Sequence, residues 1–383
     1  MKKIKIGLML SFSLIVLAAC GNVASSSGAS GISKNNSSSG YQTTGQTSDS
    51  NYEGVIKSGK YLTSKSRGVA LTQNENVLNL KSFESGLLDL SKSQFATNDY
   101  IFQEGQYLSK ETVQNWLSRE SGSNSEGLNP KDNGKTGETE RNPMYVQQLE
   151  EQDFMTKKDN KMALAGISLG IGMNSVDYYQ KEEYGAQYKT EISDATMKEK
   201  GKEAANKVVA RFRKTKGVSD SVPIMVAMYK QASNDSLVGG SFYAYAVNKN
   251  GKTTIDSWKD VSITSYTFPT TSSATTPNTN DETTFTNFKT EVQSFFPNLA
   301  GVTAQVQYKN KAITGMHINI TSQFYGETEI VSFTQYLATT AAKYLASGIP
   351  IDITVKGSDG TIQSFLAKSA KDSSYYTHVF TSY

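Results

Sequence analysis

The chain has 383 residues, 37% of them hydrophobic and 20% charged, and this is enough apolar sequence for two folded domains of ordinary size. Its formal charge of +3 comes from the N-terminus, because residues 1–19 carry three lysines and no acid, which leaves 36 basic and 36 acidic residues in the rest of the chain. A neutral chain lacks the basic surface that attracts nucleic acids, so we expect no nucleic-acid partner.

The N-terminus has the pattern of a secretory signal peptide. Three lysines precede an apolar stretch from about Ile6 to Leu17, and the small residues Ala18 and Ala19 follow it. The stretch is shorter than the roughly 20 apolar residues that span a bilayer as a helix, and no other segment approaches that length. We therefore expect residues 1–19 to be a removable signal peptide and the rest of the chain to be exported.

Cys20 is the only cysteine and follows the signal peptide directly. The sequence Leu17–Ala18–Ala19–Cys20 matches the lipobox of bacterial lipoproteins, where signal peptidase II cuts before a cysteine that carries acyl chains such as palmitate. The alternative is a secreted protein with an incidental, unpaired thiol. Because two or more acyl chains anchor a protein stably, we expect lipidated Cys20 to hold the chain at the extracellular face of the cell membrane.

The segment 20–51 is expected to be a disordered tether. After Cys20 it consists almost entirely of Ser, Gly, Asn, Thr and Gln, a composition that cannot bury enough apolar surface to fold. A flexible chain of about 30 residues has an r.m.s. span on the order of 30 Å. The folded part is therefore expected just outside the membrane.

A first α/β domain is expected over residues 52–266. Helical spacing of apolar residues appears around 87–95 and 113–117, with Ser109 at the start of the second helix. The polar stretch 120–143 is longer than a compact domain leaves without structure, so it is interpreted as a mobile or a functional loop.

The same domain continues with a strand, a helix and two further strands. Residues 162–179 read as a buried strand that contains glycines, and an amphipathic helix follows with Asp194 as N-cap and Gly217 as its C-terminal stop. Strands are expected at 222–231 and 240–258, the latter as a hairpin that turns at 248–251.

A Thr/Ser-rich linker, 267–283, is expected to separate a second α/β domain, 284–383. This domain should run helix, strand, strand, helix and a final pair of strands, at 285–296, 301–310, 312–325, 329–348 and on either side of a turn at 357–360. The predicted fold class is α+β, with two α/β units built on antiparallel or mixed sheets.

The sequence holds no constellation that specifies catalysis. Its two histidines, His317 and His378, lie 61 positions apart and are interpreted as structural or exposed. The HExxH, CxxC, GxSxG and Walker A patterns are absent. The run Gly166–Gly172 lacks the GxGxxG spacing, and glycines inside a strand more often mark a bulge or close packing. We expect no enzymatic activity, catalytic residue, metal, cofactor or nucleotide.

Acidic pairs are the remaining candidates for chemistry. Glu150–Glu151, Glu182–Glu183 and Asp177 are expected on solvated faces, because a chain with 36 acids places many of them there. The separation that a glycosidase needs between two carboxylates cannot be judged from sequence.

Tyrosine is abundant, with 21 residues, and gives the better functional indication. Tyr178, Tyr179, Tyr243 and Tyr245 are candidate ligand-binding residues, because aromatic faces bind sugars and peptides. The alternative is that aromatic residues at alternate strand positions simply pack.

Runs along nearly the whole mature chain, in matching order, resemble the CamS sex-pheromone lipoproteins of Gram-positive bacteria. The matching runs are 83–117, 127–130, 142–154, 163–179, 222–231, 242–247, 295–308 and 329–337.

The resemblance implies a lipid-anchored α/β domain with no assigned enzymatic activity. It also implies that the apolar part of the signal peptide is trimmed to a hydrophobic pheromone that triggers conjugative plasmid transfer. The matching stretch is Ser13, Leu14, Ile15, Val16, Leu17, Ala18 and Ala19. Two alternatives remain: an extracellular binding protein for peptide or cell-wall glycan, and a wall-active hydrolase.

Overall fold

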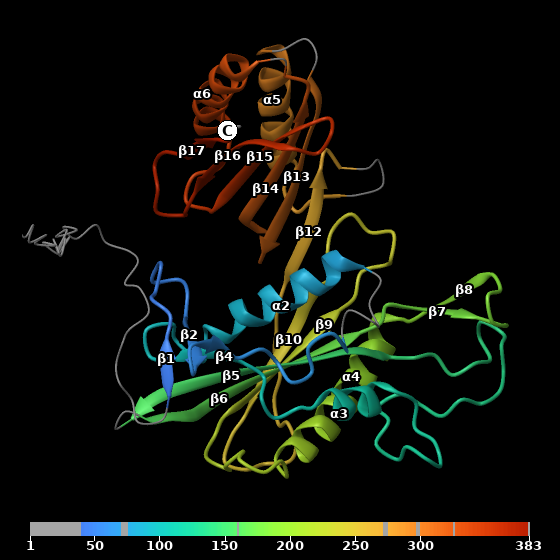
Figure 1. Cartoon of the computed structure of the whole chain (residues 1–383). Coiled ribbons are helices and arrows are strands. Elements are labelled where there is room, and N and C mark those ends of the chain that lie inside the picture. The colour runs from blue at the N-terminus through green and yellow to red at the C-terminus, as the bar shows by residue number, and fades with distance from the viewer. Residues whose placement is uncertain are drawn as a thin grey trace, which may run out of the picture.

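The computed structural model describes residues 40–69, 76–158, 161–270, 275–295, 299–324 and 326–381 (Figure 1). The signal peptide, the pheromone candidate Ser13–Ala19, Cys20 and residues 21–39 lie outside this range. The described chain forms two units, each a β-sheet covered by helices, and the predicted α+β class is confirmed.

The first unit is built on a nine-stranded mixed sheet of order β1-β2-β4-β5-β6-β9-β10-β11, with β3 paired to β2. The pairs β2–β4 and β6–β9 are parallel and the other pairs are antiparallel. The strands are β1 (Tyr41–Thr43), β2 (Glu53–Lys57), β3 (Lys60–Tyr61), β4 (Ile101–Glu104), β5 (Val146–Lys158), β6 (Lys161–Met173), β9 (Ile224–Lys230), β10 (Ser241–Asn248) and β11 (Lys259–Asp260).

Strand β1 corrects the predicted extent of the tether. Residues 41–43 fall inside the segment 20–51, yet they pair antiparallel with residues 55–57 of β2. An edge strand offers unpaired backbone N–H and C=O groups, so a polar segment can join a sheet without burying apolar side chains. Amino-acid composition alone therefore does not predict that a polar segment pairs with the edge of a sheet.

Helices cover both faces of this sheet (Figure 1). Helix α2 (Val77–Ser91) packs Phe83 and Leu87 on one face, and α3 (Lys110–Leu117) and α4 (Asp194–Phe212) pack on the other. Ser109 caps α3 as predicted, its Oγ accepting the N–H of Thr112 at 3.1 Å.

Two details of α4 differ from the prediction. Ser193, not Asp194, is the N-cap, because its Oγ accepts the N–H of Thr196. The helix ends at Phe212, well before Gly217. The chain leaves the helix at Arg213, whose buried guanidinium donates to Oδ1 of Asn248 and to the carbonyl oxygen of Val222.

Asn248 also alters the predicted hairpin. Strand β10 does pair with β11, but the connection spans 249–258 rather than a tight turn at 248–251. Nδ2 of Asn248 donates to the carbonyl oxygen of Thr254 at 2.9 Å, which holds the longer loop in place.

Glycines in β6 allow close packing against the sheet, which is one of the two predicted alternatives. A Cβ on Gly166 would lie 2.2 Å from the Phe95 ring, and one on Gly170 would lie 2.7 Å from the Phe83 ring. On the opposite face, Ile167, Leu169 and Ile171 enter the core under α4. The run therefore serves close packing.

The second unit has a six-stranded sheet of order β12 to β17, with β14–β15 parallel and helices α5 and α6 packed side by side (Figure 1). The predicted sequence of helices and strands is present in this unit. The elements are β12 (Ile263–Phe268), α5 (Thr279–Phe295), β13 (Leu299–Lys309), β14 (Ala312–Ser322), α6 (Glu327–Tyr344), β15 (Ile351–Gly357), β16 (Ile362–Lys368) and β17 (Tyr376–Val379).

The boundary between the units lies earlier than the predicted linker. Strand β12 pairs with β13 over its whole length, and Phe268 is fully buried in the second core. The Thr/Ser-rich segment 267–283 therefore contains the end of β12, the start of α5 and the connection between them.

Candidate functional site

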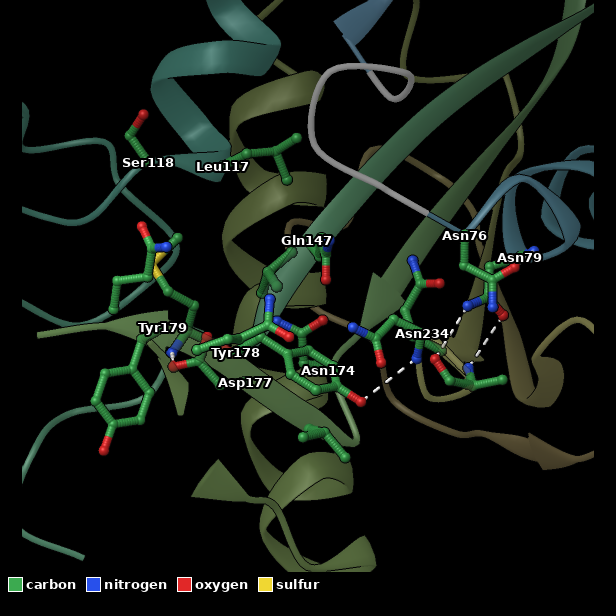
Figure 2. A pocket seen from close by; sticks show the side chains of 17 residues that line it. Asn76, Asn79, Leu117, Ser118, Gln147, Asn174, Asp177, Tyr178, Tyr179 and Asn234 are labelled. Carbon is green, nitrogen blue, oxygen red and sulfur yellow. Dashed lines mark hydrogen bonds between the residues drawn. The ribbon is translucent and has the colours of Figure 1, made fainter. Parts of the chain in front are cut away.

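A polar cavity of about 570 Å³ lies at the carboxyl ends of the parallel strands β6 and β9 (Figure 2). Ligand pockets in α/β sheets favour such strand ends, and their volumes fall in this range. The lining residues are Asn76, Asn79, Leu117, Ser118, Met144, Val146, Gln147, Asn174, Val176, Asp177, Tyr178, Tyr179, Gln180, Gln187, Gln231, Ala232 and Asn234. We call this space the amide cavity, because Asn and Gln side chains dominate it.

The first turn of α2 forms one wall. Asn76 caps the helix through Oδ1 and donates Nδ2 to the carbonyl oxygen of Ser233 at 3.0 Å. Asn79 exchanges two hydrogen bonds with the backbone of Ala232, each 3.0 Å long. These bonds fix α2 to the end of β9, so this wall is preformed.

The opposite wall is the hairpin of β7 (Val176–Gln180) and β8 (Gln187–Glu191). The Asp177 carboxylate accepts the backbone N–H of Met144 at 2.9 Å and forms an ion pair with the Arg141 guanidinium. The guanidinium also lies 3.9 Å from the centre of the Tyr179 ring. The lining thus carries a single acid, and a cation already neutralises it.

The loop 120–143 is fastened to this wall rather than loose. Besides the Arg141 ion pair, the Tyr179 hydroxyl donates to the carbonyl oxygen of Thr136, and the Thr190 hydroxyl donates to that of Glu138. Of the two predicted interpretations, these contacts favour a loop that helps to build the site.

The chemistry of the amide cavity suits a neutral polar ligand. Each Asn or Gln side chain offers both a donor and an acceptor, as a sugar hydroxyl or a peptide group requires. Tyr178 adds an aromatic ring beside Asn234, whose backbone N–H donates to the Tyr178 hydroxyl at 3.4 Å (Figure 2). A charged ligand would find no unpaired opposite charge among the lining residues.

The four candidate tyrosines fall into separate places. Tyr178 and Tyr179 line the amide cavity. A bulge between Phe242 and Ala244 turns Tyr243 toward the core under α4, and Tyr245 packs on the opposite face with the core under α2. Burial raises the pKa of Tyr243.

The expectation that the acidic residues are solvated is wrong for Glu151 and Asp177, which are 2% and 4% exposed. Strand β5 lies in the middle of the sheet, so its side chains meet covered faces. The Glu151 carboxylate accepts three backbone N–H groups from residues 106–108. Burial raises its pKa and that of neighbouring Asp153. Glu182 and Glu183 are exposed, as predicted.

Glu150, the other member of the first pair, points to the α2 side of the sheet. Burial raises its pKa to about 8, a neighbouring bond from Gln152 opposes the rise, and the charges of Glu84 and Glu104 add to it. It lies in a second cleft, outside the amide cavity.

Sequence reasoning missed the amides that form the cavity. Asn76, Gln147, Asn174, Gln231 and Asn234 come from four separated segments, and none belongs to a motif. Only the N-cap position of Asn76 has a local sequence pattern.

The histidines bear no sign of a shared site. His317 on β14 is exposed, although partial desolvation lowers its pKa, and His378 is exposed on β17. Across the ranges given above, no three His, Cys, Asp or Glu side chains are placed to hold a metal ion. In the same ranges, no helix combines the length and apolar character needed to cross a membrane.

The fold and this site define a two-unit α+β protein with a neutral, preformed polar cavity. Residues 61–374 match the family described as CamS sex pheromone cAM373 precursor, and the chain belongs to this family. The resemblance drawn from the sequence runs is thereby confirmed.

Two solved structures are similar over most of the chain. The sex pheromone precursor from Lactobacillus salivarius subsp. salivarius UCC118 is 57% identical, with a TM-score of 0.86, covering 90% of this chain and 100% of that one. The C-terminal domain of the sex pheromone staph-cAM373 precursor from Staphylococcus aureus is 28% identical, with a TM-score of 0.70, covering 81% and 99%. No curated protein matches the chain.

Proposed function

We propose that the chain is a non-enzymatic lipoprotein, anchored through lipidated Cys20 at the extracellular face of the cell membrane, whose leader yields a hydrophobic peptide pheromone for conjugative plasmid transfer. The observation that carries this is the run Leu17–Ala18–Ala19–Cys20, which places the only thiol at the end of a basic and apolar leader. Membership of a sex pheromone precursor family supports the proposal that the leader yields a pheromone. The candidate peptide is Ser13–Ala19.

Replacing Cys20 with alanine is expected to abolish labelling by a palmitate analogue, because the acyl chains have no other thiol to join. Membrane retention through the lipid should fall by at least about tenfold, and the Ser13–Ala19 peptide should disappear from the culture supernatant. Lipid labelling, fractionation and mass spectrometry of the supernatant measure these changes.

Ser25→Ala, a change in the segment that follows, serves as the matched control and should behave as the wild type. Unchanged labelling of the Cys20→Ala protein would exclude the anchor. The pheromone half fails separately if synthetic Ser13–Ala19 peptide leaves plasmid transfer at its basal rate.

The amide cavity favours a second function, the binding of a neutral polar polymer. We infer that the folded part binds a cell-wall glycan or a peptide backbone there. The cavity supports this through its volume, its neutralised acid and its many amide groups, with the Tyr178 ring beside them.

Tyr178→Ala is expected to weaken binding of soluble wall fragments by about tenfold, because aromatic contacts of this kind contribute roughly 1 kcal/mol or more. The change also removes the bond to Asn234. Tyr184→Ala is the matched control, since Tyr184 is 91% exposed in the turn of the same hairpin. Calorimetry with wall glycan and peptide fragments measures both. Equal binding by the two variants would contradict this use of the cavity.

A further inference from the structure

A second cleft, of about 480 Å³, lies between α2, the strands β4 and β5, and the turn at 64–68. In Figure 1, α2 runs across this face of the sheet. Its lining combines carboxyl and hydroxyl side chains with the apolar Leu80, Leu88 and Phe102, and residues of β5 form its floor. We call it the glutamate cleft, after Glu84, Glu104 and Glu150, which line it.

The floor carries an unused acceptor. Gln152 is 3% exposed, and its Nε2 donates to Oε1 of Glu150 at 2.9 Å and to the carbonyl oxygen of Glu84 at 3.2 Å. Its Oε1 is buried and accepts no hydrogen bond from the described residues. Because a buried oxygen without a donor is costly, this atom indicates a missing donor.

Glu84, Glu104 and Glu150 share the cleft, and none of the three forms an ion pair with another residue that the structure describes. Burial, with the charges of Glu84 and Glu104, raises the pKa of Glu150 to about 8 against the opposing hydrogen bond from Gln152. Burial also raises the pKa of Glu84, to which Glu104 adds. Glu104 accepts the N–H of Ser64 at 2.5 Å. At neutral pH, Glu150 therefore keeps its proton while the cleft is empty of a cation.

Two cations stand at the exposed rim. Arg67 and Lys81 line the cleft, and neither forms an ion pair with another residue that the structure describes. Arg67 is close enough to lower the pKa of Glu84. The cleft thus presents acceptors at its floor and positive charge at its rim.

We propose that the glutamate cleft binds a basic amino acid or a peptide's C-terminal lysine, with the side-chain ammonium on the floor and the carboxylate at the rim. An ammonium has three donors and no acceptor, which matches Glu104, Glu150 and the free Oε1 of Gln152. A carboxylate matches the guanidinium of Arg67. This site is separate from the amide cavity and does not depend on the functions proposed above.

Calorimetric titration of the purified full chain with L-lysine tests the proposal. At pH 7 the bound ammonium favours ionised Glu150, so binding should release up to one proton, and the heat should differ between phosphate and Tris buffers. Since the proton must leave, the affinity should rise with pH, by up to about tenfold per unit, until pH is near 8. The other charged residues that line the cleft are Lys81 and Glu84 on α2, Glu104 on β4, Glu151 on β5, and Arg67.

The ligand series separates the two ends of the cleft. Cadaverine, which lacks the carboxylate, should bind about tenfold more weakly if Arg67 and Lys81 hold that group. Norleucine, which lacks the side-chain ammonium, should give no heat. Equal binding of all three compounds would overturn the assignment.

Glu150→Gln is expected to weaken L-lysine binding by about tenfold or more and to make the heat independent of the buffer. The variant should fold, because Glu150 is already protonated at neutral pH, and thermal unfolding checks this. Glu182→Gln, an exposed change elsewhere in the unit, should bind as the wild type.

Three outcomes would overturn the proposal. The first is no binding by the folded wild type at about 10 mM L-lysine, a concentration that detects even millimolar affinity. The second is unchanged proton release in Glu150→Gln. The third is hydrolysis of a wall-glycan probe that is lost in Glu150→Gln, which would assign the cleft to catalysis instead.

Discussion

Replacing Asn129 with alanine is expected to lower the free energy of unfolding of the first unit by about 3 to 5 kcal/mol. Asn129 is 1% exposed, and all four hydrogen bonds of its amide go to backbone groups. Nδ2 donates to the carbonyl oxygens of Leu117 and Val146 at 2.7 and 2.8 Å. Oδ1 accepts the N–H groups of Tyr145 and Val146 at 2.7 and 2.8 Å. Alanine removes the side-chain partner of these four backbone groups, and three of the four bonds are buried.

The magnitude follows from that loss of partners. A hydrogen bond contributes only about 1 kcal/mol net, but a buried group left unsatisfied costs about 1 to 3 kcal/mol. The same bonds tie the end of α3 to the start of β5, and Leu117 and Val146 line the amide cavity. The variant should therefore also bind wall fragments less well at temperatures where it remains folded.

Urea unfolding followed by tryptophan fluorescence measures the effect cleanly. Trp116 and Trp258 are the only tryptophans, and both pack in the core of the first unit. Asn133→Ala is the matched control: Asn133 lies in the same loop and is exposed, and its amide makes two exposed bonds, donating to the carbonyl oxygen of Glu140 and accepting the N–H of Lys135. Its change should stay within about 0.5 kcal/mol. Similar midpoints for the two variants would show that Asn129 is not the fastening point.

The elements that the sequence predicts well are those with a local physical cause. Ser109 caps a helix because its own hydroxyl reaches the N–H three residues on, and this needs no distant partner. Strand β6 is predictable because Ile167, Leu169 and Ile171 alternate with small residues, so one face is apolar and the other is open to close packing. The fold class follows from the order of such elements.

The structure differs from the prediction where a partner that is distant in sequence determines the conformation or burial of a residue. Arg213 reads as a cation at a helix end, yet Asn248 and the carbonyl oxygen of Val222 draw its guanidinium inward and end α4 there. Glu151 reads as a surface acid, yet three backbone N–H groups from another segment satisfy it inside the sheet. In both cases the hydrogen-bond partners are distant in sequence from the residue that they hold.

In the candidate site, too, some features are predictable from local sequence and others depend on the tertiary fold. Tyr178 and Tyr179 could be singled out as aromatic neighbours, and they do lie together. Tyr243 and Tyr245 obey the same two-residue spacing, but the bulge at β10 sends them to opposite faces. The amides of the cavity come from segments that only the pairing of β5, β6 and β9 brings together.

Gly166→Ala is expected to destabilise the first unit by about 1 to 3 kcal/mol, although the same change at an open position would be neutral or stabilising. The new methyl group would lie 2.2 Å from Cε1 of Phe95. That ring cannot move aside, because it is fully buried and stacks on Phe154 with centroids 4.4 Å apart. Replacing a glycine also stabilises a protein by roughly 0.4 to 1 kcal/mol, because it lowers the conformational entropy of the unfolded chain. The steric overlap with Phe95 costs more than this gain.

A double-mutant cycle separates this overlap from any other cost of a strand alanine. Phe95→Leu alone should destabilise by about 1 kcal/mol or more, because it leaves a gap in the core. In the Gly166→Ala background the smaller side chain makes room for the methyl group, so the pair should be less destabilising than the sum of the single changes. Gly122→Ala, with nothing within 4 Å of its added Cβ, is the control and should unfold as the wild type does. Strict additivity of Gly166→Ala and Phe95→Leu, read by tryptophan fluorescence, would mean that Gly166 does not make room for the Phe95 ring against β6.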